Sequence, residues 1–305
     1  MTSPMILLAV KVGIALLVFG VGLTATVRDT TYFLRHRALF GWSMVSMYVA
    51  MPLLAAWLCL KFELPPAIAL ALVALSISPV PPFLPGKATK AGGGGSYTVG
   101  LVVATSLLAA VIVPTSLSII GRVFALPLSA PIGQVVKIVA ATLLLPMALG
   151  IGVAHLRPAA ARGGKRVMTL ATIMLAVAIV PILFTSWSAF GQLIGDGSLA
   201  VIVALTLAGL FVGHILGGPE PEDRTVLALA TTARHPAVAI AIATANFPDN
   251  KLIVPAVLLA LLVSAAASAP YVAKSRRRAR ARVHSLPTTP NATAFRFGQP
   301  RSRQR

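Results

Sequence analysis

Three consecutive residues in the last quarter of the chain, Arg234, His235 and Pro236, have side chains suited to chemistry. They interrupt residues 226–247, which are apolar on both sides of the interruption. An arginine at membrane depth is costly unless it faces water or a partner, so it marks a candidate functional site. Proline lacks an amide hydrogen and disfavours helical geometry at the residue before it, which frees backbone groups for a ligand. The pattern predicts a discontinuous transmembrane helix with a binding site at its break.

Arg234 carries a permanently charged donor fork that suits a carboxylate, sulfonate or phosphate group. We therefore predict that it binds an anionic substrate, assisted by Lys87 beside an earlier break. The hydroxyl groups predicted to line the same cavity are those of Thr231, Thr232, Ser96 and Thr98. Structural alternatives stay open, because Arg234 could neutralise helix carbonyls, Lys87 could snorkel to the aqueous side and hydroxyls often bond to their own helix.

His235 is the candidate for a coupling proton, because imidazole is the side chain that titrates near neutral pH. The adjacent positive charge of Arg234 disfavours a protonated ring unless an anion is bound. A neutral imidazole in a polar network is the alternative, so the sequence leaves proton coupling and facilitated transport both open.

The composition excludes an ordinary soluble domain. Of the 305 residues, 57% are hydrophobic and only 11% charged, and the mean hydropathy is +0.88. Such a chain is typical of an all-α polytopic membrane protein. A single cysteine, Cys59, excludes an internal disulfide framework and a multi-cysteine metal site. We expect no metal, no cofactor and no enzyme activity, since nucleotide-binding loops and the His-Glu-x-x-His metal motif are missing.

Hydropathy predicts about nine transmembrane spans between residues 1 and 273. Their predicted bounds are 5–27, 37–60, 65–96 (broken), 97–121, 131–156, 167–187, 198–217, 225–247 (broken) and 252–273. With the N-terminus outside, the outer loops hold only Lys61, Arg122 and Lys251, and the cytoplasmic loops hold most of the arginine. This asymmetry follows the positive-inside rule and predicts a bacterial inner-membrane protein with a cytoplasmic C-terminus.

Residues 274–305 form a basic tail that starts with the sequence KSRRRARAR and accounts for much of the net charge of +19. We predict that this tail is disordered and cytoplasmic, and that it contacts anionic lipid headgroups rather than nucleic acid. The oligomeric state is not readable from the sequence.

Two of the predicted spans, 65–96 and 225–247, are interrupted by proline, and each is followed by one unbroken span. Interrupted spans at corresponding positions of two halves are typical of transporters built from inverted repeats. The positions correspond, although the two halves share no residue-level similarity.

Several stretches, in this order and spacing, resemble the bile acid:sodium symporter family over residues 7–273. They are VFGVGLTATVRD, AMPLLAAWL, LPPAIALALVAL and AGGGG in the first half, and VVKIVAATLLLPMALGIGVAH and ARHPAVAIAIATANFP in the second. The resemblance implies a core domain with two crossed discontinuous helices, a panel domain, and alternating access by movement between them. Nine spans would correspond to a ten-helix arrangement without its first helix.

The chain departs from that family at the positions that the resemblance assigns to sodium binding. In the second broken helix, Ala230, Arg234 and His235 stand where sodium-coupled members have glutamate, glutamine and asparagine. The other assigned positions fall at Leu84, Pro85, Met47, Val102 and Thr98, of which only Thr98 keeps a suitable ligand. All seven acidic residues fall in loops or at span ends, so no carboxylate is available at mid-membrane. Sodium coupling through the usual sites is therefore not expected.

These observations together predict a secondary transporter of small organic anions that works by alternating access and is proton-coupled or facilitative. The alternative is a transporter-derived membrane sensor or scaffold that binds an anion and signals through its basic tail. The two hypotheses differ in their dependence on the tail, since its deletion would abolish signalling but leave transport largely intact.

Overall fold

The computed structural model describes residues 4–123, 128–129 and 131–285, and every regular element in these ranges is helical. The chain is thus an all-α membrane protein, as its composition predicts. The elements are α1 (Pro4–Thr24), α2 (Val27–Thr30), α3 (Tyr32–Arg35), α4 (Arg37–Met44), η1 (Val45–Ala50), α5 (Met51–Lys61), α6 (Pro66–Ile77), α7 (Leu84–Lys90), α8 (Gly95–Val123), α9 (Ile132–Val139), η2 (Ala140–Leu144), α10 (Leu145–Leu156), η3 (Pro158–Gly163), α11 (Gly164–Leu193), α12 (Ser198–Leu216), α13 (Pro221–Thr232), α14 (Pro236–Asn246) and α15 (Ile253–Ser285).

Seven stretches of the described chain are long and apolar enough to cross a membrane, and α1 and α6 contribute two shorter apolar helices. The two predicted broken spans correspond to α6–α7 and to α13–α14, each with a non-helical connection at its prolines. Helix bounds differ from the predicted spans by a few residues at most ends, and α11 is longer than its predicted span of 167–187. The total of nine spans and their repeat relation stay predictions.

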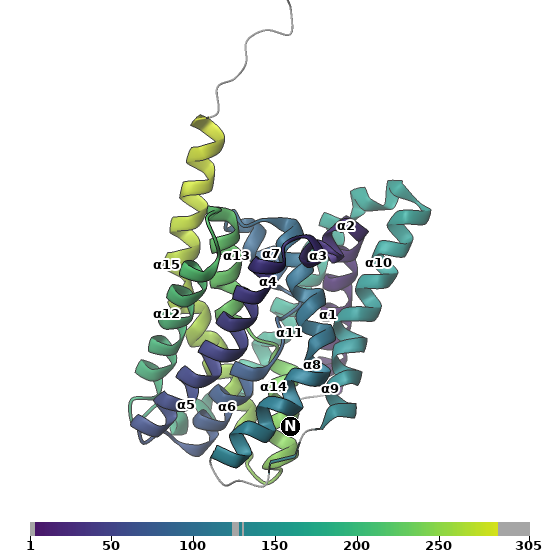
Figure 1. Ribbon diagram of the computed structural model, residues 1–305. Helices are drawn as coiled ribbons and strands as arrows, with labels where there is room; N and C mark the ends of the chain where they lie inside the picture. The colour runs from purple at the N-terminus through teal and green to yellow at the C-terminus, as the bar shows by residue number, and fades with distance from the viewer. Residues whose placement is uncertain (1–3, 124–127, 130, 286–305) are drawn as a thin grey trace, which may run out of the picture.

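Helices α1, α10 and α11 pack together on one side of the molecule (Figure 1). The backbones of α1 and α10 approach closely at Gly22 and Gly150. A Cβ atom on Gly22 would collide with the backbone of Met147, and one on Gly150 would collide with that of Phe19. Small residues permit such close helix contact in membranes, where it depends on van der Waals packing.

The remaining long helices form a second group around the two broken segments. Helix α12 packs against α13, α15 packs against α6 and α12, and α14 packs against α6, α9 and α15. The halves of the two broken helices are therefore enclosed by helices that lie far apart in the sequence. This second group positions the candidate site.

The start of α1 lies in the lower half of the bundle in Figure 1, whereas the end of α15 projects from its top. Helix α15 continues beyond the predicted span end at residue 273 to Ser285, so residues 274–285 are helical where disorder was expected. Ala279 of this extension packs directly on Gly92 in the glycine-rich turn, which gives the helix a contact inside the protein. Residues 286–305 lie outside the described part of the chain.

Candidate functional site

The two helix breaks meet directly. Helix α6 ends at Ile77, where Pro79, Pro81 and Pro82 remove the amides that would continue it. Helix α13 ends at Thr232, before Pro236. The backbone amide of His235 in the second break donates to the carbonyl of Pro79 in the first break, at 2.9 Å. The predicted pairing of the two discontinuous segments therefore rests on a backbone hydrogen bond between their non-helical connections.

Arg234 lies inside this meeting point with only 3% of its surface exposed. Its Nη2 donates to the carbonyl oxygen of Met47 at 2.7 Å, and its Nη1 donates to that of Ser78 at 3.3 Å. Its Nε has no hydrogen-bond partner among the described residues. The guanidinium also lies over the ring of Tyr48, with 5.5 Å between Cζ and the ring centroid. Arg234 is thus held by backbone oxygens and an aromatic face.

The first of these oxygens comes from a π-helical turn, η1, within the span 37–61. Pro52, one residue beyond the start of α5, has no amide, so the preceding turn lacks one intrahelical donor. A donor from residue 52 would reach Met47 in the π-helical pattern, and its loss leaves that carbonyl free to accept from Arg234. The same turn contributes Ser46, whose hydroxyl bonds that of Thr231 at 2.7 Å.

The second oxygen belongs to Ser78, the residue that caps the C-terminal end of α6. Carbonyl groups at a helix C-terminus lack intrahelical donors and carry partial negative charge. They are therefore suitable acceptors for a buried cation. Val80, two residues further on, donates its amide to the hydroxyl of Thr105 in α8, which holds this break in place.

His235 is fully buried and reaches a different neighbour from Arg234. Its Nε2 lies 3.2 Å from the hydroxyl of Thr142 in η2, the second π-helical turn. Its Nδ1 has no partner in the part of the chain that the structure describes. Like the first π-helical turn, η2 is followed closely by a proline, Pro146. The two residues of the break thus contact two separate π-helical turns.

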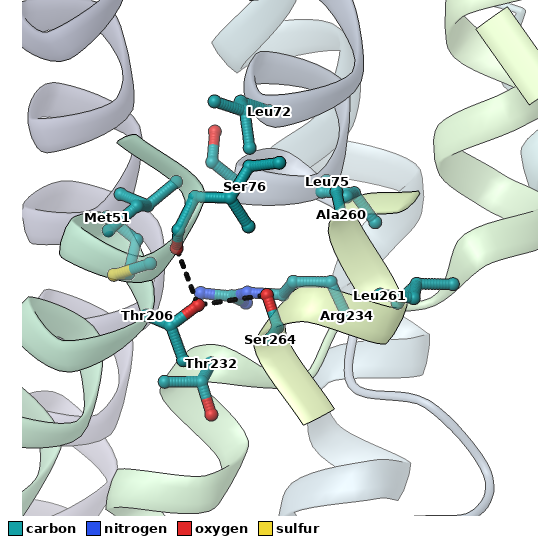
Figure 2. A pocket seen from close by; sticks show the side chains of 12 residues that line it. Met51, Leu72, Leu75, Ser76, Thr206, Thr232, Arg234, Ala260, Leu261 and Ser264 are labelled. Atoms are coloured by element: carbon teal, nitrogen blue, oxygen red, sulfur yellow. Dashed lines mark hydrogen bonds between the residues drawn. The ribbon is translucent and has the colours of Figure 1, made fainter. Parts of the chain in front are cut away.

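A small cavity of about 30 Å³ borders Arg234 inside the second helix group (Figure 2). Its polar lining also includes Thr232 of α13, Ser76 of α6, Thr206 of α12 and Ser264 of α15. Figure 2 shows the guanidinium extending from the break toward Thr206 and Met51. The cavity has room for water but not for an organic acid. In this conformation the site is closed.

Some of the predicted site residues converge, and others have their contacts elsewhere. Thr231 and Thr232 flank the break, and Thr232 shares the cavity with Arg234. Lys87, by contrast, donates from Nζ to the hydroxyl of Ser268 in α15 at 3.0 Å. Thr98 donates to the carbonyl of Gly94 in its own helix turn.

Ser96 is exposed near Asp29, in the short α2 helix. Burial raises the pKa of Asp29, but hydrogen bonds from Ser96 and Thr26 outweigh this effect and hold the pKa below its usual value. The hydroxyl of Ser96 thus stabilises a carboxylate at the end of the bundle. This contact places Ser96 in a local network of the connecting segments rather than at the break.

The electrostatic balance of the site is positive. Among the described residues, Arg234 is the one lysine, arginine, aspartate or glutamate that is buried, so no buried carboxylate compensates it. No group of three or more histidine, cysteine, aspartate or glutamate side chains in the described ranges has the arrangement of a metal site. An uncompensated cation at membrane depth favours an anionic ligand.

Sequence reasoning missed Ser46, the carbonyl of Met47 as an acceptor, Tyr48 and Thr142. The first three lie in one largely apolar span, and Thr142 lies in another, so nothing in their types marks them. The usable signal is Pro52 and Pro146, which stand inside otherwise uninterrupted apolar segments. An interior proline implies a free carbonyl in the preceding turn, and this carbonyl needs a donor.

Comparison with known protein families gives one match. The model of the sodium bile acid symporter family matches residues 11–196, which is more than half of the chain. The matched region contains α6, α7 and both π-helical turns but ends before α12, so it does not reach Arg234. No curated protein matches the chain significantly.

Proposed function

Because the chain belongs to the sodium bile acid symporter family, a family of membrane transporters, we propose that it is a secondary carrier of small organic anions. The carrier works by alternating access and does not use sodium. It has nine spans in a bacterial inner membrane, with the N-terminus outside and the C-terminus in the cytoplasm. The anion binds at the meeting point of the two breaks, with Arg234 as its main contact and Thr232 beside it.

The observation that supports this proposal is the buried, uncompensated charge of Arg234. Its two known hydrogen-bond acceptors, the carbonyls of Met47 and Ser78, are neutral, so the site keeps a net positive charge. Helix α14 begins at Pro236, two residues after Arg234 in the chain. Amides at a helix N-terminus favour an anion, which adds to the effect of the arginine.

The small volume of the cavity agrees with a carrier in a closed conformation. An organic acid needs more space than the 30 Å³ beside Arg234, so the helices that enclose it must separate before substrate enters. Thr206 and Ser264, which bond each other across the cavity at 2.9 Å, join α12 to α15 and have to part in this step. Their hydroxyls then become available to a carboxylate.

Coupling to protons is assigned to His235. Its Nδ1 has no protein partner among the described residues, and its Nε2 contacts only the hydroxyl of Thr142. The Thr142 hydroxyl donates to the carbonyl of Ile138 at 2.7 Å, so it accepts from Nε2–H of the ring. A neutral imidazole with its proton on Nε2 and a protonated one both supply this donor, so the contact tolerates both states. A bound anion next to Arg234 favours protonation of the ring, which would link the two binding events.

The test is uptake of a panel of labelled organic acids into proteoliposomes, with sodium and proton gradients imposed separately. We expect an inward proton gradient to stimulate uptake of at least one acid and a sodium gradient to have no effect. Sodium-dependent uptake would contradict the proposal. Folded protein that moves none of the acids would favour the sensor hypothesis instead.

A further inference from the structure

We propose that the backbone carbonyls of Met47 and Ser78 form a cation site and that the guanidinium of Arg234 occupies it as a tethered cation. The site takes free guanidinium when the Arg234 side chain is shortened. This inference does not rest on the proposed substrate, because it concerns what holds the arginine rather than what the arginine binds.

The two carbonyls form a preorganised acceptor site for a cation rather than being incidental neighbours of Arg234. The Met47 carbonyl lies in a π-helical turn and lacks an intrahelical donor because Pro52, in the following helix, has no amide hydrogen. The Ser78 carbonyl lacks one because Ser78 caps the C-terminal end of α6. Both are buried within the bundle, where an unpaired carbonyl is costly. The Nη1 and Nη2 atoms of a single guanidinium satisfy both, so the two oxygens match the spacing of one planar donor group.

The aromatic ring of Tyr48 adds a second feature that selects a cation. Its centroid lies 5.5 Å from Cζ of Arg234, which is within the range of a cation–π interaction. Tyr48 belongs to the same π-helical turn as Met47, so this turn presents a carbonyl and a ring to the same charge. A neutral group of the same shape would gain less from this pair of contacts.

The tethered cation gives a reason for the missing carboxylate. A freely diffusing cation is usually bound by negatively charged side chains, because it loses translational entropy on binding. A covalently attached cation does not lose this entropy. Neutral carbonyls are then sufficient, and the charge that they leave uncompensated remains available to a substrate. Within the described residues, no aspartate or glutamate side chain is buried at the breaks.

Thermal unfolding of the purified full chain in detergent tests this inference without any transport assay. We expect the Arg234→Ala variant to unfold at a lower Tm than the wild type and millimolar guanidinium chloride to raise that Tm with a saturating dependence on concentration. Equal concentrations of urea, a neutral molecule of similar shape, and of N-methylglucamine chloride, a bulky salt, should leave it unchanged. The wild type should respond to none of them.

Matched variants make the result specific. Arg224 also donates to a backbone carbonyl, that of Gly218, but lies outside the breaks, so Arg224→Ala should gain nothing from guanidinium. Arg234→Met fills the space without a donor and should also fail to respond. Absence of any guanidinium effect on Arg234→Ala, or an equal effect of urea or on Arg224→Ala, would overturn the inference. If Arg234→Ala does not fold, a higher Tm for Arg234→Lys than for Arg234→Met supports the site, and equal values overturn it.

Discussion

The two broken segments each carry one cation close to the break, and the surroundings of these cations differ. Arg234 lies in the break itself, fully enclosed, and donates to carbonyls on two other elements. Lys87 lies one turn beyond its break, in α7, and donates to one hydroxyl on α15 while remaining half-exposed. Position relative to the interrupted backbone, rather than charge, therefore decides which cation is fixed at the centre of the molecule.

The largest expected effect comes from removing the fixed cation. Arg234→Ala should lower organic-acid uptake by about tenfold or more, because hydrogen bonds to charged groups contribute roughly 1.5–3 kcal/mol. Arg234→Lys should keep part of the uptake, since it preserves the charge but not the fork. The measurement is initial uptake into proteoliposomes at matched protein content. Wild-type rates in both variants would remove Arg234 from the substrate site.

The next effect concerns the second residue of the same break. His235→Gln should abolish stimulation by an inward proton gradient while leaving downhill uptake measurable, because glutamine keeps a polar side chain but does not titrate. The readout is the ratio of uptake with and without the gradient. His214, which bonds Tyr271 at 2.7 Å, provides the matched control, and His214→Gln should keep the stimulation. Persistent stimulation in His235→Gln would show that the proton travels elsewhere.

A smaller effect should follow from restoring an amide in the π-helical turn. In Pro52→Ala, the new amide competes with Arg234 for the carbonyl of Met47, and uptake should fall by about fivefold, which corresponds to one neutral hydrogen bond. Pro181→Ala in α11 removes a proline from a helix on the other side of the molecule and serves as the control. Equal losses in the two variants would mean that the effect is not specific to the arginine.

The smallest effect is expected at the cation outside the break. Lys87→Ala should change uptake by about twofold at most, because substitutions away from a binding site usually cost within roughly 0.5 kcal/mol. The same uptake assay measures it, with Lys90→Ala in the last turn of α7 as the partner variant. A loss as large as that of Arg234→Ala would show that both cations bind substrate, and the contrast between the two breaks would disappear.

The sequence allows much of the fold to be predicted, because membrane helices are dominated by local signals. Apolar runs long enough to span a bilayer locate most helices within a few residues, and the prolines at 79–85 and at 236 locate both interruptions. The end of α15 is the main exception. Within its extension Ala279 packs against Gly92, a contact between distant segments that the local composition does not indicate.

The arrangement of the site is less accessible to sequence reasoning. The residue types correctly indicate that Arg234 is buried at a break, but they do not determine the direction in which it points. Lys87 is predicted to assist Arg234 because it is a cation beside a proline break, and only the fold shows that its Nζ reaches Ser268. The contributions of Met47 and Ser78 are entirely backbone oxygens, which have no signature in the side-chain sequence.

The close approach of α1 and α10 at Gly22 and Gly150 has a consequence for how the protein moves. Because a Cβ atom on either glycine would collide with the backbone of the other helix, these two helices are in direct backbone contact, which favours their moving together. We expect α1 and α10 to move as one rigid unit. The relative movement needed for transport should then occur at the border between this unit and the helices that hold Arg234. Cross-linking α1 to α10 would then leave turnover intact, whereas a link across that border would arrest it.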